Sequence, residues 1–262
     1  MNRIQPLKRF GQNYLQDRNI LLKIVDEINP QEDDALIEIG PGHGMLTGEL
    51  SARTGSLTAV EIDNRVIDEL RARFPGVNII NNDFLKLDIL SLFELKGKKL
   101  RVAGNIPYNI TSPIIFRLIE RTELVEDAVF MMQYEVARRL SSDRGTKDYG
   151  ILAVILKYFG EVKFCFKVPP EVFYPKPKVF SAVVHIYFNQ SRTDNEFNKA
   201  FIKVVKAAFG NRRKTLKNSL SNSIFGQLNF EPSGVDMKLR AEQLEQNDFI
   251  RLTEFVLNNE RL

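Results

Sequence analysis

The chain has 262 residues, enough for one large domain or a large and a small one, with a core that folds without disulfide bonds. Its 37 Lys and Arg residues barely exceed its 33 Asp and Glu residues, a balance compatible with almost any soluble protein. No segment is apolar for long enough to span a bilayer, and the N-terminus lacks the apolar core of a signal peptide. A soluble, cytoplasmic protein is therefore expected.

Metal and thiol chemistry have little support in the sequence. The single cysteine, Cys165, lies in the apolar run "VKFCFKV", which predicts a strand residue in a reducing compartment and not a nucleophile. With one cysteine and two histidines distant from each other, His43 and His185, no zinc-ligand spacing is present. We expect no metal site, which also excludes a zinc deaminase.

Short runs rich in Ile, Val and Leu predict buried strands. They are "ALIEIG" (35–40), "LTAVEI" (57–62), "VNIIN" (77–81), "LRVAGNI" (100–106) and "DAVFMMQ" (127–133). The segments between them have helical spacing, as in "NRVIDELRARF". This alternation predicts an α/β fold, with a parallel sheet that is wound with helices on both faces.

The pattern changes in the second half of the chain. The segments "AVILKYFGEVKFCFKV" and "SAVVHIYF" are separated by a Pro-rich loop, "PPEVFYPKPKVF", and predict an antiparallel pair at the sheet edge. The polar stretch "NQSRTDNE" after residue 188 reads as a linker, and the spacing beyond it, from Phe197 to Phe209 and on to Ile224, is helical throughout. We therefore expect domains at 1–188 and 189–262, the second small and all-α.

A glycine-rich loop follows the first strand. In "EIGPGHGMLTGEL", Gly40, Gly42 and Gly44 permit a tight turn and let a ligand approach the backbone at the start of a helix. A dinucleotide fingerprint would need glycine where Met45 stands, so the pattern disfavours NAD. The loop alone is a weak signal.

Acidic residues follow at the ends of the next two strands. Glu61 can accept hydrogen bonds from both ribose hydroxyls of an adenosine, and Asp83 can accept one from the exocyclic amine of adenine. This pair suits S-adenosylmethionine, whose methionine carboxylate can use the amides of the glycine loop. The alternatives are that Glu61 caps the following helix and that Asp83 belongs to a turn.

The fourth strand ends in "GNIPYNI", which fits methyl transfer to an amine. The exocyclic amine of adenine is a poor nucleophile, because its lone pair is delocalised into the ring. The side-chain carbonyl of Asn105 and the backbone carbonyl of Ile106 or Pro107 can accept its two hydrogens and aim the lone pair at a sulfonium methyl. Pro107 would fix this geometry and Tyr108 would stack on the base. No strong general base is required, and the main work is positioning.

A base in a folded nucleic acid must be unstacked to enter such a pocket, and a second aromatic side chain would hold it there. Phe173 is the candidate and Tyr174 the less favoured one. The alternative for Phe173 is that it anchors its loop in the core.

Clusters of basic residues make a polyanionic partner plausible, the alternative being a solvated basic face. They are Arg3, Lys8 and Arg9; Lys176 and Lys178; and Arg212, Arg213, Lys214 and Lys217.

With these motifs in place, the chain resembles the ribosomal RNA adenine dimethyltransferases, above all those that act on small-subunit RNA. The resemblance covers nearly the whole chain, through "KRFGQNYL", "EIGPGHGMLT", "VEID", "NNDFL", "GNIPYNITSPIIF", "GTKDYGILAV", "PPEVFYPKPKVFSAVV", "FGNRRKTLKNSL" and "LRAEQL". It implies a Rossmann-like class I methyltransferase domain with a small helical RNA-binding domain. The implied reaction transfers four methyl groups from S-adenosylmethionine to two adjacent adenosines of the 3′-terminal hairpin.

The resemblance also assigns residues. The candidate cofactor-binding residues are Asn13, Leu15, Gly40, Gly42, Glu61, Ile62, Asp83, Phe84 and Asn105. Two positions depart from the family's usual pattern: Tyr14 stands where Phe is more common, and Ile106 where the small-subunit enzymes more often have Leu. Without the resemblance, "GQNYLQD" would read only as the start of an amphipathic helix.

Three functions remain open from the sequence. The motif "NIPY" is also typical of enzymes that methylate large-subunit RNA and confer antibiotic resistance, whereas "RRKTLKNSL" and "LRAEQL" favour the small-subunit branch. A non-catalytic assembly factor on the same fold is the third, and a checkpoint role in subunit assembly beside catalysis is implied by the family. The expected partner is small-subunit ribosomal RNA or an immature small subunit, bound by a monomer.

Overall fold

The computed structural model describes residue 7 and residues 11–189 and 194–260. The basic cluster of Arg3, Lys8 and Arg9 and residues 190–193 of the expected linker lie outside the described residues. The chain divides into two units: Met1–Ala137 with Val162–Phe188, and Arg138–Glu161 with Asn189–Leu262. The expected division at residue 188 differs from this, because residues 138–161 join the second unit.

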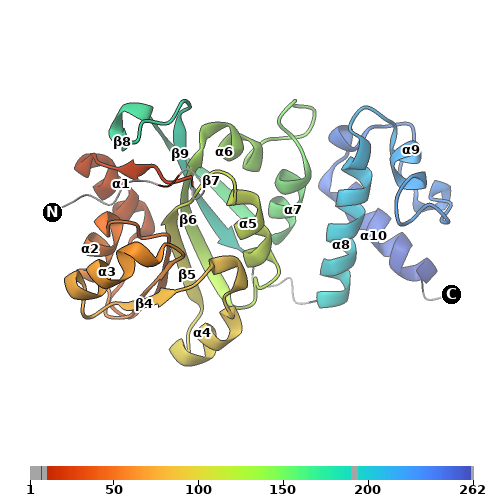
Figure 1. Cartoon of the computed structure of the whole chain (residues 1–262). Coiled ribbons are helices and arrows are strands. Elements are labelled where there is room, and N and C mark those ends of the chain that lie inside the picture. The colour runs from red at the N-terminus through yellow and green to blue at the C-terminus, as the bar shows by residue number, and fades with distance from the viewer. Residues whose placement is uncertain (1–6, 8–10, 190–193, 261–262) are drawn as a thin grey trace. The chain divides into compact units, whose positions relative to one another are not determined.

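The first unit is built on a sheet with the strand order β4-β3-β2-β5-β6-β9-β7 in the described part of the chain (Figure 1). Its strands are β2 (Ala35–Ile39), β3 (Leu57–Glu61), β4 (Asn78–Asn81), β5 (Leu100–Asn105), β6 (Val125–Gln133), β7 (Gly160–Val168) and β9 (Ser181–Phe188). Strands β2 to β6 pair in parallel, and β9 pairs antiparallel with β6. The predicted parallel sheet with an antiparallel addition near its edge is confirmed.

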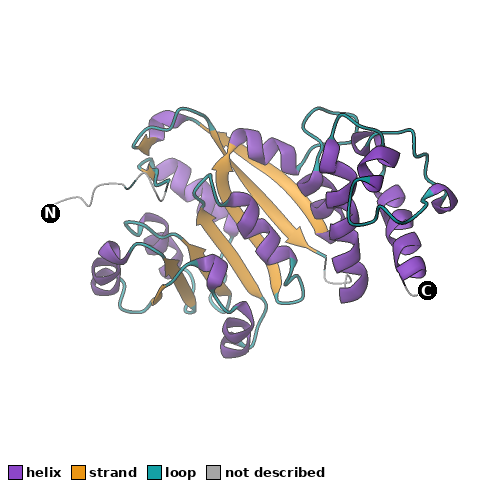
Figure 2. Ribbon diagram, turned by 45° about the vertical axis from the view of Figure 1, so that its right-hand side comes forward, coloured by secondary structure: helices purple, strands orange, loops and turns teal. Residues whose placement is uncertain are grey.

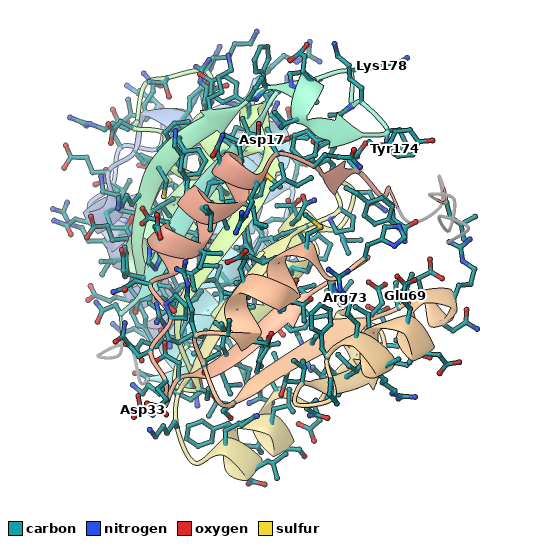
Figure 3. The ribbon with its side chains drawn as sticks, turned by 90° about the vertical axis from the view of Figure 1, so that its left-hand side faces the viewer. Asp17, Asp33, Glu69, Arg73, Tyr174 and Lys178 are labelled. Carbon is teal, nitrogen blue, oxygen red and sulfur yellow. The ribbon has the colours of Figure 1, made fainter. Side chains whose placement is uncertain are left out.

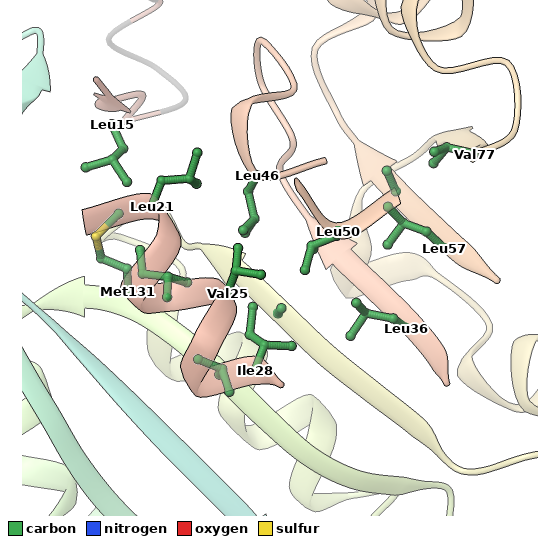
Figure 4. Packing of buried hydrophobic residues seen from close by; sticks show 14 of the residues in the cluster. Leu15, Leu21, Val25, Ile28, Leu36, Leu46, Leu50, Leu57, Val77 and Met131 are labelled. Atoms are coloured by element: carbon green, nitrogen blue, oxygen red, sulfur yellow. The ribbon is translucent and has the colours of Figure 1, made fainter. Parts of the chain in front are cut away.

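Helices cover both faces of this sheet (Figure 2). They are α1 (Arg18–Ile28), α2 (Met45–Ser51), α3 (Ile67–Arg73), α4 (Ile89–Lys96) and α5 (Thr111–Ile119), and α6 (Tyr134–Leu140) contains the boundary between the two units. Apolar residues three or four positions apart give one buried stripe to α1, and the Asp17 side chain caps it by accepting the amide of Ile20 at 3.0 Å. Figure 4 shows this stripe packed with Leu36, Leu46 and Met131.

A two-residue strand holds the N-terminal segment in place. Strand β1 (Tyr14–Leu15) pairs antiparallel with β8 (Phe173–Tyr174), which lies in the Pro-rich loop. The sequence "GQNYLQD" therefore holds a two-residue strand at its centre, and the helix begins only at Arg18. This ladder joins two sequence motifs that are about 160 residues apart, as the pairing of Tyr14 with Tyr174 shows.

The second unit contains α7 (Ile151–Phe159), α8 (Asn195–Ala208), α9 (Leu216–Ser221) and α10 (Gln246–Glu260). The prediction of strand from residue 153 was wrong, because an apolar run reads alike as buried strand or buried helix. Tyr158 stacks on Phe201 with ring centroids 4.1 Å apart and donates its hydroxyl hydrogen to Asn198 Oδ1. These contacts explain why α7 belongs to the C-terminal unit.

Helix does not continue through the whole C-terminal region, contrary to prediction. Residues 222–245 form turns and short 3₁₀ segments between α9 and α10. Within the described residues, no helix is long and apolar enough to cross a membrane.

Candidate active site

Four neighbouring strands place the expected site residues at one edge of the sheet. Gly40 follows β2, Glu61 ends β3, Asp83 follows β4 and Asn105 ends β5. Two adjoining cavities of about 710 and 300 Å³ lie there, and both are lined by Tyr14, Gly40 and Asn105. The carboxyl ends of parallel strands are where open α/β sheets bind ligands.

All nine expected cofactor-binding residues line one or both cavities. Leu15 lines the larger one; the smaller one is lined by Asn13, Gly40, Gly42, Glu61, Ile62, Asp83, Phe84 and Asn105. The motifs that follow β4, β3, β2 and β5 thus meet at one site, because these four strands are neighbours in the sheet.

Glu61 is buried, and its carboxylate organises the glycine loop. Its Oε2 accepts the amide of Gly42 at 3.0 Å and its Oε1 accepts the amide of Asp63 at 2.8 Å. Burial raises its pKa, against the lowering effect of these amides. The side chain that caps the next helical turn is Asp63, which accepts the amide of Arg65. The helix-capping alternative for Glu61 therefore does not describe this structure.

Asp83 combines both readings that the sequence left open. Its Oδ1 accepts the amide of Leu85 at 3.0 Å and caps the 3₁₀ turn Phe84–Lys86, as a turn residue would. The residue also borders the smaller cavity beside Ile62 and Phe84. A polar side chain next to two apolar ones gives the chemistry that an adenine ring requires.

The "NIPY" motif is held by contacts from two other parts of the chain. The Asn105 side chain donates from Nδ2 to the backbone carbonyl of Asn13 at 2.8 Å. The hydroxyls of Tyr108 and Ser181 lie 2.7 Å apart, and burial raises the pKa of Tyr108. Pro107 and Tyr108 both line the smaller cavity.

The structure distinguishes the two backbone carbonyls that the sequence left as alternatives. The carbonyl of Pro107 accepts the amide of Ile110 at 3.1 Å and the hydroxyl of Thr111 at 3.4 Å, as α5 begins. The carbonyl of Ile106 is therefore the better candidate to accept a hydrogen from a substrate amine.

The aromatic candidates occupy different surroundings. Phe173 is only 5% exposed and packs in the hydrophobic cluster of α1 and the sheet, as the loop-anchoring alternative would have it. Tyr174 is 53% exposed and lines the larger cavity; Figure 3 shows it on the outer loop near Lys178. Of these two candidates, Tyr174 is the one whose ring is accessible.

One buried carboxyl was not singled out from the sequence. Glu38 is the last residue but one of β2 and lines the larger cavity, where burial raises its pKa to about 8. Its Oε2 has no hydrogen-bond partner among the described residues. The available signal was the position itself, because a carboxyl inside the buried run "ALIEI" needs a reason to be there.

The basic candidates for RNA contact also differ in their surroundings. Arg212 donates from Nη2 to the carbonyls of Lys147 and Tyr149 at 2.6 and 3.0 Å, within the second unit. Lys176 pairs with Glu171 and Lys217 with Glu231, both at the surface. Lys178, Arg213 and Lys214 are exposed.

The matching family model and similar relatives both point to ribosomal RNA methyltransferases. Residues 4–258 match the model of the family "Ribosomal RNA adenine dimethylase". The chain is 44% identical over 254 residues to "Ribosomal RNA small subunit methyltransferase A" from Francisella tularensis subsp. novicida, a match that covers 95% of this chain and 97% of the relative. The corresponding protein of Francisella tularensis subsp. tularensis is 43% identical with the same coverage.

Two solved structures share the fold over nearly the whole chain. A dimethyladenosine transferase from Plasmodium falciparum gives a TM-score of 0.78 at 26% identity, covering 95% of this chain and 98% of that one. The 23S rRNA methyltransferase ErmE gives 0.67 at 27% identity, covering 92% and 98%. The chain belongs to the ribosomal RNA adenine dimethylase family, enzymes that transfer methyl groups from S-adenosylmethionine to adenine in ribosomal RNA.

Proposed function

We propose that this protein dimethylates the N6 amines of two adjacent adenosines in the 3′-terminal hairpin of small-subunit ribosomal RNA. The observation that carries the proposal is the placement of Asn105, which borders both cavities and is held in one orientation by the carbonyl of Asn13. The choice of the small subunit is supported by relatives over 40% identical along nearly the whole chain that bear the name small subunit methyltransferase A.

The cavities fit S-adenosylmethionine, whose sulfonium supplies an electrophilic methyl group when bound. Glu61 would bind the ribose hydroxyls, and Asp83 would accept a hydrogen from the adenine amine between Ile62 and Phe84. Glu38, whose Oε2 has no hydrogen-bond partner among the described residues, would give a place for the ammonium of the methionine end. Gly40 and Gly42 have φ of +67° and +55° and line the smaller cavity. Because glycine has no side chain, a ligand can approach the loop backbone closely at these positions.

The chain's own residues would prepare the target amine. With its Nδ2 engaged, Asn105 directs Oδ1 toward one hydrogen of the amine, while the carbonyl of Ile106 accepts the other. These acceptors favour the pyramidal form of the nitrogen and orient its lone pair. Tyr108, fixed through Ser181, would stack on one face of the base, and an aromatic ring of the Pro-rich loop would cover the other. Of the two, Tyr174 is accessible; a role for Phe173 would need that loop to open.

Contacts with the rest of the RNA would come from exposed cations on both units. Lys178 lies on the same loop as Tyr174, and Arg213 and Lys214 lie between α8 and α9. Phosphate contacts of this kind position a protein without reading sequence. We propose that the enzyme acts as a monomer on immature small subunits, and its location would then be cytoplasmic.

The proposal is tested by incubating the purified protein with labelled S-adenosylmethionine and one of two substrates: undermethylated small subunits or naked large-subunit RNA. Dimethyladenosine formed only in the small subunits is expected. Label only in large-subunit RNA would move the protein to the resistance branch, and tight binding without label would identify a non-catalytic factor.

A further inference from the structure

Tyr14 occupies an unusual position between the two cavities of the active site. It lies in β1, lines both cavities and packs its ring against the glycine loop. A Cβ atom added at Gly42 would lie 2.7 Å from Cε1 of this ring, and the ring centroid lies 4.5 Å from that of His43. The ring is therefore fixed on the loop that faces the cofactor.

The hydroxyl of Tyr14 is buried and has no hydrogen-bond partner within the described part of the chain. Burial of an unpaired hydroxyl costs free energy, which is why such groups are rare in proteins unless a ligand satisfies them. Burial, together with the nearby charges of Glu61 and Asp63, raises the pKa of Tyr14 to about 12, so the hydroxyl keeps its hydrogen and can donate it.

The neighbouring carboxylates have partners of their own. Glu61 accepts two backbone amides, as described above. Asp63 pairs with the Arg65 guanidinium at 2.6 Å and accepts the Gln12 side chain at 3.1 Å. The charged groups around Tyr14 are thus organised without its hydroxyl, which is left without a partner among the described residues on a side chain that lines both cavities.

We propose that the Tyr14 hydroxyl is a further cofactor-binding group, which hydrogen-bonds the ribose that Glu61 holds. This rests on the assignment of Glu61 to the ribose under the proposed function. A phenylalanine at this position would keep the ring packing against Gly42 but supply no hydroxyl. The contact therefore depends on a single oxygen atom, and its removal leaves the shape of the site unchanged.

The test is Tyr14→Phe, with binding of S-adenosylhomocysteine measured by calorimetry. Loss of one neutral hydrogen bond should weaken binding about two- to tenfold. Without ligand, the variant should unfold at the same temperature or about 2 to 4 °C higher, because the unpaired hydroxyl is gone. A purely structural hydroxyl would give the opposite pattern: unchanged affinity and a lower unfolding temperature.

The site of the contact is tested with 5′-methylthioadenosine, which has the ribose but lacks the amino-acid end. The same loss of affinity is expected with this compound. A loss seen only with S-adenosylhomocysteine would overturn the ribose contact, as would unchanged affinity for both.

Two further variants separate this inference from the proposed function. Tyr187→Phe removes a hydroxyl that lies 2.8 Å from His185 Nδ1 and lines neither cavity, and should leave affinity unchanged. Glu61→Gln should weaken binding of both ligands. If Glu61→Gln has no effect, the assignment of the ribose site fails; if it weakens binding and Tyr14→Phe does not, only the Tyr14 contact fails.

Discussion

The side-chain amide of Asn105 and the backbone carbonyl of Asn13 are 2.8 Å apart, although 92 positions separate the two residues in sequence. Because Nδ2 of Asn105 is engaged with Asn13, its Oδ1 points away from Asn13, at the other edge of the planar amide group. The N-terminal motif therefore sets the direction of the side-chain carbonyl that, under the proposed function, would prepare the target amine. This one hydrogen bond would thus join the segment proposed to bind the cofactor to the side chain proposed to activate the substrate.

Asn105→Ala should abolish most turnover. Removing one preorganised polar group from a site that stabilises a transition state costs about 10²- to 10³-fold in kcat. The unfolding temperature should change little, since the side chain is half-buried and borders open cavities. Single-turnover methylation of undermethylated small subunits measures the effect. A kcat within threefold of the parent enzyme would mean that Oδ1 does not contact the amine.

Phe173 and Tyr174 should respond differently to truncation. Phe173→Ala removes a buried ring and should lower the free energy of unfolding by about 3 to 5 kcal/mol. Tyr174→Ala should leave stability within about 0.5 kcal/mol and reduce kcat/KM about tenfold, through loss of base stacking. Denaturant unfolding of both variants measures the change in stability, and steady-state kinetics measures the change in kcat/KM. Normal kinetics in Tyr174→Ala, with reduced kcat/KM in a folded Phe173→Leu, would return the stacking role to Phe173.

Glu38 should make the ligand-free protein less stable as the pH rises. Its pKa is about 8 in the folded chain against 4.5 as the ordinary value, so between these values the folded state binds more protons than the unfolded state. Stability from this group is thus complete below pH 4.5 and is lost toward pH 8, by roughly 1.4 kcal/mol per unit at most. Glu38→Gln should therefore gain stability relative to the parent between pH 5 and 8. If the unfolding free energies of the parent and of Glu38→Gln changed with pH in parallel, this prediction would be contradicted.

Of the basic residues between α8 and α9, Arg212 should stabilise the fold, whereas Arg213 and Lys214 should bind RNA. Arg212→Ala removes donors to two backbone carbonyls and should cost about 1 to 2 kcal/mol of stability, since the side chain is partly exposed. Arg213→Ala with Lys214→Ala should leave stability unchanged and weaken binding to small subunits. The slope of log affinity against log salt should fall by about one for each cation that contacts phosphate. An unchanged slope would exclude these residues from the interface.

Much of the first unit could be predicted from the sequence. The strands from 35 to 133 are dense in Ile, Val and Leu, and parallel strands buried on both faces read as continuous apolar runs. Alternation with helices predicts parallel strands, and the carboxyl ends of parallel strands lie at one edge of the sheet, so Glu61, Asp83 and Asn105 were expected to meet there. Local pattern and topology were enough for this part of the site.

Features that depend on long-range packing could not be predicted in this way. The helix at 151–159 looks like a strand because it is apolar on nearly all sides, and only its contacts with Phe201 and Asn198 place it in the second unit. The β1–β8 ladder is two residues long on each side and carries no periodic signal. Its register decides that Phe173 faces the core and Tyr174 the cavity, an alternation that reverses with a shift of one residue.

The most direct test of the account is to map the products on the 3′-terminal hairpin of small-subunit RNA. Undermethylated small subunits would be incubated with S-adenosylmethionine and either the parent enzyme or Asn105→Ala, and the hairpin fragment analysed by mass spectrometry. The account predicts two adjacent dimethyladenosines with the parent enzyme and an unmodified hairpin with the variant at equal subunit occupancy. Methyl groups elsewhere, or the same product from both proteins, would contradict it.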